Sequence, residues 1–231
     1  MRLYKKIHNV IVAFLFAGLA SMALPVYAEV EEDGRLWFNQ TLQGALTEQV
    51  GWYVEMQQRL REEGGDLDQL LFRPALKFTL SANSSVWLGY GYVSTHPNEG
   101  DTVYEHRLWQ QYLHQFDTWH GLTLSSRTRL EQRHVAGAED TGHRLRQLLR
   151  MQYPLGVMNA SVVVWDEYFV HLNDTDWQAR RGFDQNRLFV GAAFKCTPQT
   201  KLEVGYLNQT INTASPDKSN HVLSTLLAVD F

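Results

Sequence analysis

From about residue 49 to the last residue, apolar and polar side chains alternate along the chain with a period of two. In one segment Val50, Trp52 and Val54 would share one face of a strand, and Tyr53 and Glu55 the other. This period is typical of β-strands whose two faces meet different surroundings, whereas an amphipathic helix has a period of 3.6. The sequence therefore predicts an all-β fold.

The last strand in this pattern ends on an aromatic carboxy-terminus. Leu227, Val229 and Phe231 fall on one face of residues 221–231. This ending resembles the terminal signal by which outer-membrane β-barrels are delivered to the barrel-assembly machinery. We expect these three side chains to point outward, toward lipid, at the periplasmic rim of such a barrel.

The beginning of the chain predicts secretion across the inner membrane. Arg2, Lys5 and Lys6 precede an apolar run, and the small-residue site 26–28 follows it. This order is typical of a signal peptide, here residues 1–28, cleaved after Ala28. No later segment reaches the roughly 20 apolar residues of a transmembrane helix. The sequence thus places the protein in the cell outer membrane of a Gram-negative bacterium.

Length and charge restrict the possible partners. Removing 28 residues from 231 leaves 203, which is one domain by length. The leader holds three of the 21 basic residues and no acidic one, so the remainder has 18 basic and 25 acidic residues and a net charge of −7. This charge argues against a nucleic-acid partner. With Cys196 as the single cysteine, no Cys/His zinc spacing exists, and we expect neither a metal nor a cofactor.

Turns and aromatic residues favour a closed antiparallel transmembrane β-barrel over a soluble sandwich. Short and long connections are expected to alternate strictly, as in bacterial barrels with periplasmic turns and external loops. Aromatic residues near the strand ends would form two girdles at the membrane interfaces. The lower girdle would hold Phe78, Phe116, Trp119, Tyr153, Phe194 and Phe231, and the upper one Tyr92, Tyr104, Phe169 and Phe183.

About ten strands are expected in the barrel domain, residues 49–231, with eight or twelve as alternatives. An even number would place both chain ends in the periplasm. Residues 29–48 remain as a periplasmic cap, a plug or an extra strand. Two segments are ambiguous, because residues 103–115 are polar on both faces and residues 160–169 are largely apolar on both.

Several motifs resemble one protein family. They include 51–55 (GWYVE), 105–111 (EHRLWQQ), 166–169 (DEYF), 183–191 (FDQNRLFVG) and 202–209 (LEVGYLNQ). In these motifs the chain resembles the proteobacterial domain-of-unknown-function 2490 family, whose members are predicted outer-membrane barrels of about this length. The resemblance covers nearly the whole mature chain. It implies a fold and a compartment but supplies no catalytic or binding residues.

Arginines dominate the predicted inward face. Because neighbouring strands contribute several of them, they would meet inside the barrel with a few carboxylates. The candidate lumen residues are Arg127, Arg129, Arg133, Arg144, Arg146, Arg150, Arg187, Glu55 and Glu131; Glu105 and Glu203 would lie opposite. Such a cluster requires ion pairing or water. It predicts either an anion-attracting constriction of a small, porin-like channel or a salt-bridge network that fills a structural barrel.

Two other functions stay open. Small outer-membrane barrels include lipid-modifying hydrolases, but none of the serines forms a recognisable motif with a histidine, so no catalytic residue is proposed and the sequence leans against an enzyme. A surface-loop receptor or adhesin would use the longest loop, where Trp177, Arg180 and Arg181 lie. The two arginines there either belong to a solvated charged loop, which the sequence favours, or bind a ligand or phosphates of lipopolysaccharide, the expected partner along with outer-membrane lipid.

Overall fold

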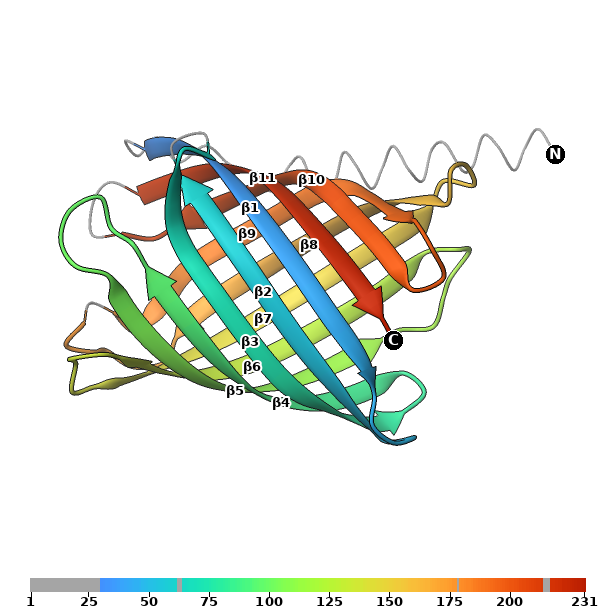
Figure 1. The fold of residues 1–231 in the computed structure, drawn as a ribbon, viewed down its shortest axis with the longest axis horizontal. Coiled ribbons are helices and arrows are strands. Elements are labelled where there is room, and N and C mark those ends of the chain that lie inside the picture. The colour runs from blue at the N-terminus through green and yellow to red at the C-terminus, as the bar shows by residue number, and fades with distance from the viewer. Residues whose placement is uncertain (1–29, 62–63, 178, 214–216) are drawn as a thin grey trace.

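A computed structural model describes residues 30–61, 64–177, 179–213 and 217–231, which form a single barrel of eleven tilted strands (Figure 1). The strands are β1 (Val30–Ala45), β2 (Val50–Arg61), β3 (Asp66–Ser81), β4 (Ser84–Thr95), β5 (Val103–Gln115), β6 (Thr123–Val135), β7 (Thr141–Pro154), β8 (Ala160–His171), β9 (Gly182–Lys195), β10 (Thr200–Ile211) and β11 (Asp217–Asp230). The predicted all-β closed barrel is confirmed. Within the described ranges, no helix is long and apolar enough to cross a membrane.

The expected even strand number is wrong. Residues 49–231 supply the ten expected strands, β2 to β11, and residues 30–45 add β1 between β2 and β11. Successive strands pair antiparallel, so the first and last of eleven run in the same direction, and β1 pairs with β11 in parallel from Val30↔Asp217 to Gln43↔Asp230. An odd count therefore makes the closing seam parallel.

The parallel seam also determines where the described chain begins and ends. Connections after the even-numbered strands lie at one end of the barrel, here called the loop end, and those after the odd-numbered strands lie at the other, the turn end. Strand β1 begins at the loop end, whereas Phe231 lies at the turn end, so the expectation of both ends on one side is wrong for residues 30–231. The predicted signal peptide, residues 1–28, lies outside the described residues.

Connection lengths alternate less strictly than expected. The longest one, residues 172–181, is at the loop end, as predicted for an external loop. However, the connection 116–122 at the turn end contains as many residues as 96–102 at the loop end. The longer turn is ordered by an isolated bridge between Trp119 and Leu122, whose backbones exchange two hydrogen bonds. The length of a connection therefore does not always show at which end of the barrel it lies.

The carboxy-terminal residue closes the seam at the turn end. The Phe231 backbone N–H donates to the carbonyl oxygen of Gln43 at 2.9 Å, and the Phe231 ring stacks on Trp52 with centroids 5.9 Å apart. Leu227, Val229 and Phe231 lie on the outward face, and Phe231 is 76% exposed. Phe231 therefore contacts β1 through its backbone and reaches β2, one strand further, through its ring.

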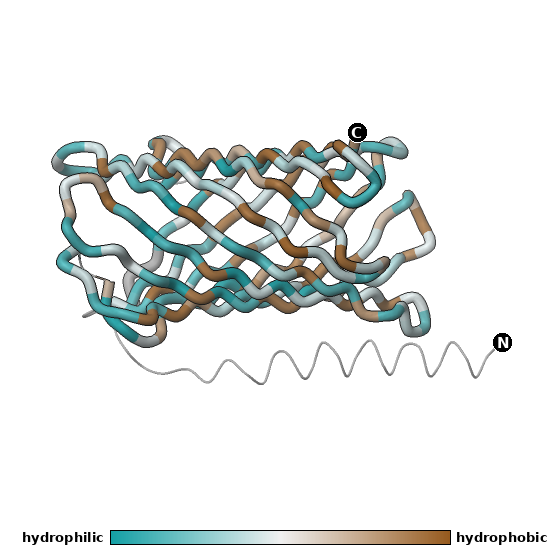
Figure 2. The backbone as a smooth tube through the Cα atoms, turned by 90° about the horizontal axis from the view of Figure 1, so that it is seen from below, coloured by the Kyte–Doolittle hydropathy of each residue, from teal (hydrophilic) through white to brown (hydrophobic). Residues whose placement is uncertain are grey.

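Hydrophobic and hydrophilic residues alternate along the barrel strands (Figure 2), and the exposure of their side chains separates an outward face from an inward face. Apolar side chains on outward positions are exposed on most strands of the barrel, including Phe38, Met56, Phe72, Leu88, Leu108, Leu145, Val190, Leu223 and Leu227. Outward polar side chains are paired laterally with each other. Gln110 and Gln132 exchange amide hydrogen bonds at 3.1 Å, and Asn186 donates to Asp166 at 2.7 Å. The wall thus presents an apolar surface in which these polar groups are paired.

The interior is filled partly by apolar side chains and partly by charged ones. An apolar cluster of Trp37, Val163, Phe189, Ala193, Leu207 and Val222 packs along the inner wall of β1 and β8 to β11. This cluster explains why residues 160–169 are apolar on both faces, since their inward face contributes to it. Phe169, expected in the upper girdle, is instead fully buried inside. It lies two residues from both Glu167 and His171 and shares the inward face of β8 with them.

Two paired glycines make room for a buried ring. Gly191 and Gly205 are cross-strand partners on the inward face of β9 and β10. A Cβ on Gly205 would lie 2.6 Å from both the Gly191 Cα and the tip of the Phe189 ring. The two bare backbones therefore allow Phe189 to fold flat against the wall, where it stacks on Trp165 with centroids 5.2 Å apart.

We expect Gly205→Ala to destabilise the barrel by about 1–3 kcal/mol, because the added methyl group must displace Phe189 or the neighbouring strand. The free energy of unfolding is measured by urea titration in detergent micelles. Ala192→Val is the control, because it adds more volume on the outward face of β9. Equal stability of the two variants would show that the glycine pair is not needed for packing.

Candidate functional site in the barrel lumen

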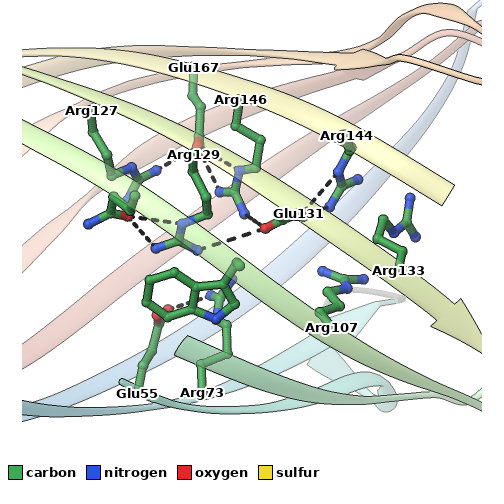
Figure 3. A network of polar contacts seen from close by, with 12 residues as sticks. Glu55, Arg73, Arg107, Arg127, Arg129, Glu131, Arg133, Arg144, Arg146 and Glu167 are labelled. Atoms are coloured by element: carbon green, nitrogen blue, oxygen red, sulfur yellow. Dashed lines mark hydrogen bonds and ion pairs between the residues drawn. The ribbon is translucent and has the colours of Figure 1, made fainter. Parts of the chain in front are cut away.

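A buried carboxylate organises the middle of the lumen. Glu131 on β6 has no exposed surface, and its two oxygens accept hydrogen bonds from Arg144 and Arg146, each with a shortest distance of 2.7 Å. Arg129 lies 3.8 Å from the same carboxylate (Figure 3). The register explains the cluster, because it pairs Glu131 with Arg144, and Arg129 with Arg146, across β6 and β7. One carboxylate therefore holds three guanidinium groups.

A second carboxylate joins this cluster from β8. Glu167 accepts from Arg127 at 2.5 Å and from Arg146 at 2.7 Å (Figure 3). Arg146 thus bridges Glu131 and Glu167. The adjacent Asp166 points outward to Asn186, as expected for neighbouring residues of a strand. Of these two adjacent carboxylates, Glu167 therefore belongs to the network inside and Asp166 to the wall outside.

Three further carboxylates each neutralise arginines elsewhere in the lumen. Glu105 pairs with Arg107 at 2.7 Å and Arg133 at 2.5 Å. Glu55 pairs with Arg73 at 2.5 Å. Glu203 pairs with Arg150 at 2.6 Å. Every predicted lumen residue except Arg187 is thus ion-paired.

Aromatic rings occupy the space between the ion pairs. Arg129 lies over the Trp109 ring at 4.1 Å from its centroid, and Arg146 lies over Phe169 at 4.5 Å. A guanidinium group over an aromatic face gains an electrostatic attraction while excluding water. Trp109 needs Gly89 opposite it, since a side chain there would overlap its ring. Layers of rings and guanidinium groups therefore cross the lumen.

These layers leave little solvent in the middle. Arg129, Arg144 and Arg146 are 3–4% exposed, and Trp109 is 1% exposed. A wide, continuous water path would expose the side chains that line it. The middle of the lumen is accordingly packed like a protein core, with charged groups satisfied by one another.

A cavity of about 200 Å³ lies above this packed region, toward the loop end. Its lining includes eight arginines but only two acidic residues, Asp68 and Asp184. The lining arginines are Arg35, Arg59, Arg73, Arg107, Arg133, Arg144, Arg146 and Arg187. The cavity is therefore polar and strongly positive, although several of these arginines are also paired to carboxylates nearby.

Arginines outnumber their partners in the described lumen. Twelve arginines occupy inward positions, and ten of them form ion pairs with eight carboxylates. Among the described side chains, Arg59 and Arg187 form no ion pair and instead contact glutamines and aromatic rings. The interior thus has a surplus of positive charge, concentrated where the cavity lies.

The predicted loop residues have separate environments. Trp177 donates its indole N–H to the Asp140 carbonyl at 2.9 Å, and its ring fills the space over Gly142. It therefore holds the 136–140 and 172–181 connections together at the loop end. Arg180 and Arg181 are exposed at the surface.

Asp176 adds to this loop pairing. Its carboxylate accepts from the backbone N–H groups of Glu139 at 2.9 Å and Asp140 at 3.2 Å, and its own N–H donates to the Asp140 side chain. These backbone donors lower the pKa of Asp176, because they favour the charged carboxylate.

One hydroxyl–histidine contact bears on hydrolysis. Ser94 lies 3.3 Å from His96 Nε2, and Thr102 lies 3.1 Å from His96 Nδ1. A Ser-His-acid site needs a carboxylate at the second nitrogen, a position that Thr102 takes here. No group of three or more His, Cys, Asp or Glu side chains within the described residues is arranged to hold a metal ion.

Sequence reasoning missed several members of the network. Arg73, Arg107 and Asp184 form ion pairs in it and Arg59 lies beside it, although alternation placed Arg59 and Arg73 on inward faces; for Glu167, the sequence indicates only that either it or Asp166 pairs with a lumen arginine. Arg107 and Glu167 lie in the two segments with ambiguous faces, so their direction was not predictable from the pattern. Among the rings that contact arginines, Phe169 was expected in the wall, Trp109 lies in the ambiguous segment 103–115, and Trp37 lies in the unassigned segment 29–48.

Comparison with known proteins assigns the chain to a family without a known activity. The family model described as Protein of unknown function (DUF2490) matches residues 34–220. The chain belongs to this family. The DUF2490 match begins within β1 and ends within β11, so it spans the barrel.

A relative of similar length is likewise uncharacterised. An uncharacterised protein of Methylorubrum extorquens is 38% identical over 225 residues, which cover 94% of this chain and 97% of the relative. No solved structure matches the chain. The lumen geometry therefore carries the functional argument.

We expect Glu131→Gln to destabilise the protein by about 3–5 kcal/mol, because it leaves buried guanidinium groups without their shared carboxylate. Glu139→Gln, an equal change in an exposed loop, should alter stability little. The free energy of unfolding is measured by urea titration of both variants. A loss for Glu131→Gln no larger than that for the control would contradict a structural role for the network.

We expect Asp176→Ala to speed tryptic cleavage after Arg180 and Arg181, because the loop loses its anchors. Asp101→Ala, in another exposed loop, is the control and should leave the cleavage rate unchanged. Because the pKa of Asp176 is lowered on folding, its contribution to loop pairing is present above the unfolded value of about 3.9 and is lost as the pH falls further. The protection factors of the Glu139 and Asp140 amides, which correct for the intrinsic pH dependence of exchange, should be higher at pH 6 than at pH 3, and equal protection factors at both would contradict this.

Proposed function

We propose that the protein is an outer-membrane barrel whose positively charged lumen binds small anions but is closed to free diffusion. The observation that carries this proposal is the buried Glu131 cluster, which crosses the middle of the lumen below a positive cavity. Between the channel and the filled barrel, this geometry favours the filled barrel.

The outer surface supports a membrane location. Exposed leucine, phenylalanine and valine side chains surround the barrel, and so large an apolar surface is typical of contact with lipid. The strands contain 12 to 16 residues, more than the roughly 9–11 that a tilted strand needs to cross a bilayer. The lateral pairing of outward amides agrees with this, because lipid offers them no hydrogen bonds. With a cleaved signal peptide and the Phe231 ending, the export route would lead to the outer membrane.

The lumen argues against an open diffusion pore. Selective pores keep charged rings in contact with water so that ions can enter and leave. Here Arg129, Arg144 and Arg146 are buried against carboxylates and rings. The charge that remains available lies in the cavity toward the loop end, where solutes from outside the cell would arrive.

We expect no stable ion conductance from the folded protein in a planar lipid bilayer. The double variant Arg129→Ser, Arg146→Ser should conduct, because it removes two long side chains from the packed middle. Arg180→Ser, Arg181→Ser is the matched control, with the same changes at exposed positions, and should stay closed. Steady, anion-selective currents through the unmodified protein would refute the closed lumen and support a channel.

A further inference from the structure

We propose that Arg59 and Arg187, with Trp37 between their strands, form a binding site for one phosphate group of a small molecule. This deepens the proposed function and rests on it for the orientation of the cavity. The site lies in the cavity of about 200 Å³ near the loop end, whose lining includes all three residues.

The two arginines differ from the other ten in the lumen. Arg59 donates to Gln57 at 2.7 Å and to Gln69 at 2.8 Å, and Arg187 donates through Nε to Gln185 at 3.2 Å. Neither has a carboxylate at ion-pair distance among the described side chains. The terminal nitrogens of Arg187 have no protein acceptor there. Two buried charges are therefore held by neutral groups only.

Both guanidinium groups lie against the same ring. The Cζ atom of Arg59 is 4.0 Å from the Trp37 ring centroid, and that of Arg187 is 4.9 Å away. Arg187 also lies 4.7 Å from the Phe169 centroid. The rings hold two like charges close together without neutralising them. Such an arrangement is costly unless an anion completes it.

Unused donors surround the same cavity. Trp37 is 2% exposed, and its indole N–H has no hydrogen-bond partner. Arg73, 5% exposed and also in the lining, has a buried Nε–H without a partner. Buried donors in folded proteins are almost always satisfied. These two N–H groups are buried behind the cavity wall, so the donors that reach the cavity itself are those of the guanidinium groups, above all the terminal nitrogens of Arg187.

The number of donors and the size of the cavity define the ligand class. A cavity of this volume is several times the roughly 30 Å³ that one water molecule occupies, so it has room for more than a chloride ion. Planar guanidinium groups bind oxyanions through paired hydrogen bonds. A phosphate group offers acceptors in a tetrahedral arrangement, which suits donors that converge from different strands better than a planar carboxylate does. Free phosphate and the phosphate of a small ester share this chemistry.

The relay beside Arg187 keeps the site in shape. Gln185 accepts from Arg187 and from Gln209, and Gln209 in turn accepts from Asn220 at 3.0 Å. All four residues are at most 8% exposed. Since the carbonyl oxygen of Gln185 is occupied by two donors, Arg187 is oriented by a neutral group and retains its charge for a ligand. Arg187 is therefore the principal anion-binding residue.

The test measures binding of inorganic phosphate and glycerol phosphate to the full-length protein in detergent micelles by titration calorimetry. Acetate and chloride are run in parallel. We expect both phosphates to bind and chloride not to, and the double variant Arg59→Gln, Arg187→Gln to lose affinity by about tenfold or more. Binding of inorganic phosphate alone would identify the free ion as the ligand, and tighter binding of glycerol phosphate would identify an ester.

Matched variants distinguish phosphate binding at this site from nonspecific attraction of anions to positive charge elsewhere on the protein. Arg180→Gln, Arg181→Gln makes the same substitutions at exposed loop positions and should bind phosphate as the unmodified protein does. Arg59→Lys, Arg187→Lys keeps both charges but removes the planar forks, so it should bind more weakly, and it serves if the glutamine variant does not fold. No phosphate binding by the unmodified protein, or equal binding by the lysine variant, would overturn the proposal.

Stability provides a second readout. Because the two arginines lack carboxylate partners, Arg59→Gln, Arg187→Gln should be at least as stable as the unmodified protein without phosphate. Phosphate should raise the unfolding midpoint of the unmodified protein only, by linkage. If the glutamine double variant is less stable than the unmodified protein, and phosphate raises the unfolding midpoints of both by the same amount, the two arginines have a packing role and the proposal fails. These measurements need no bilayer, so conductance could refute the closed lumen while phosphate binding still held.

Discussion

Charge neutralisation inside a closed β-wall is the constraint on which the rest of this structure depends. Guanidinium groups inside a barrel of this width must contact carboxylates, rings or water, because an isolated buried charge is prohibitively costly. Glu131 meets this requirement for three arginines at once, and Glu167 continues the network to β8. Removing either partner leaves charges that the packed surroundings cannot hydrate. The polar interior is therefore as specific as an apolar core, since each carboxylate requires a particular register between neighbouring strands.

The same register links the network to the seam. The pairing of Glu131 with Arg144 follows from the antiparallel register of β6 and β7. Each strand in turn pairs antiparallel with the next one along the chain. With eleven strands, the circle closes only if β1 and β11 run in parallel. Parallel pairs are slightly less stable per residue, and here the Phe231 backbone and ring add contacts across the seam region. The apolar cluster on β1 and β8 to β11 supports the same side of the wall from within.

The sequence predicted the class of fold because a period of two survives in almost every strand. It predicted that Arg127, Arg129, Arg144 and Arg146 meet inside, since residues two apart on neighbouring strands share a face. It did not predict eleven strands, because an even number was expected and the alternating stretch that forms β1 fitted a cap or a plug as well as an extra strand. It also placed Phe169 outside, since an aromatic residue near a strand end fits a girdle as well as a core. Arg187 was predicted as a lumen residue, but its lack of an acidic partner depends on distances that no pattern contains.

Membership of the DUF2490 family gives this chain relatives but no activity, so the physical state of the lumen is the central question. Exchange of the arginine Nε protons with water, measured by nuclear magnetic resonance in detergent micelles, tests it most directly. A packed lumen predicts that the Nε protons of Arg129, Arg144 and Arg146 exchange far more slowly than those of the exposed Arg180 and Arg181. Equally fast exchange for both groups would mean that water fills the middle of the barrel, and it would contradict the account.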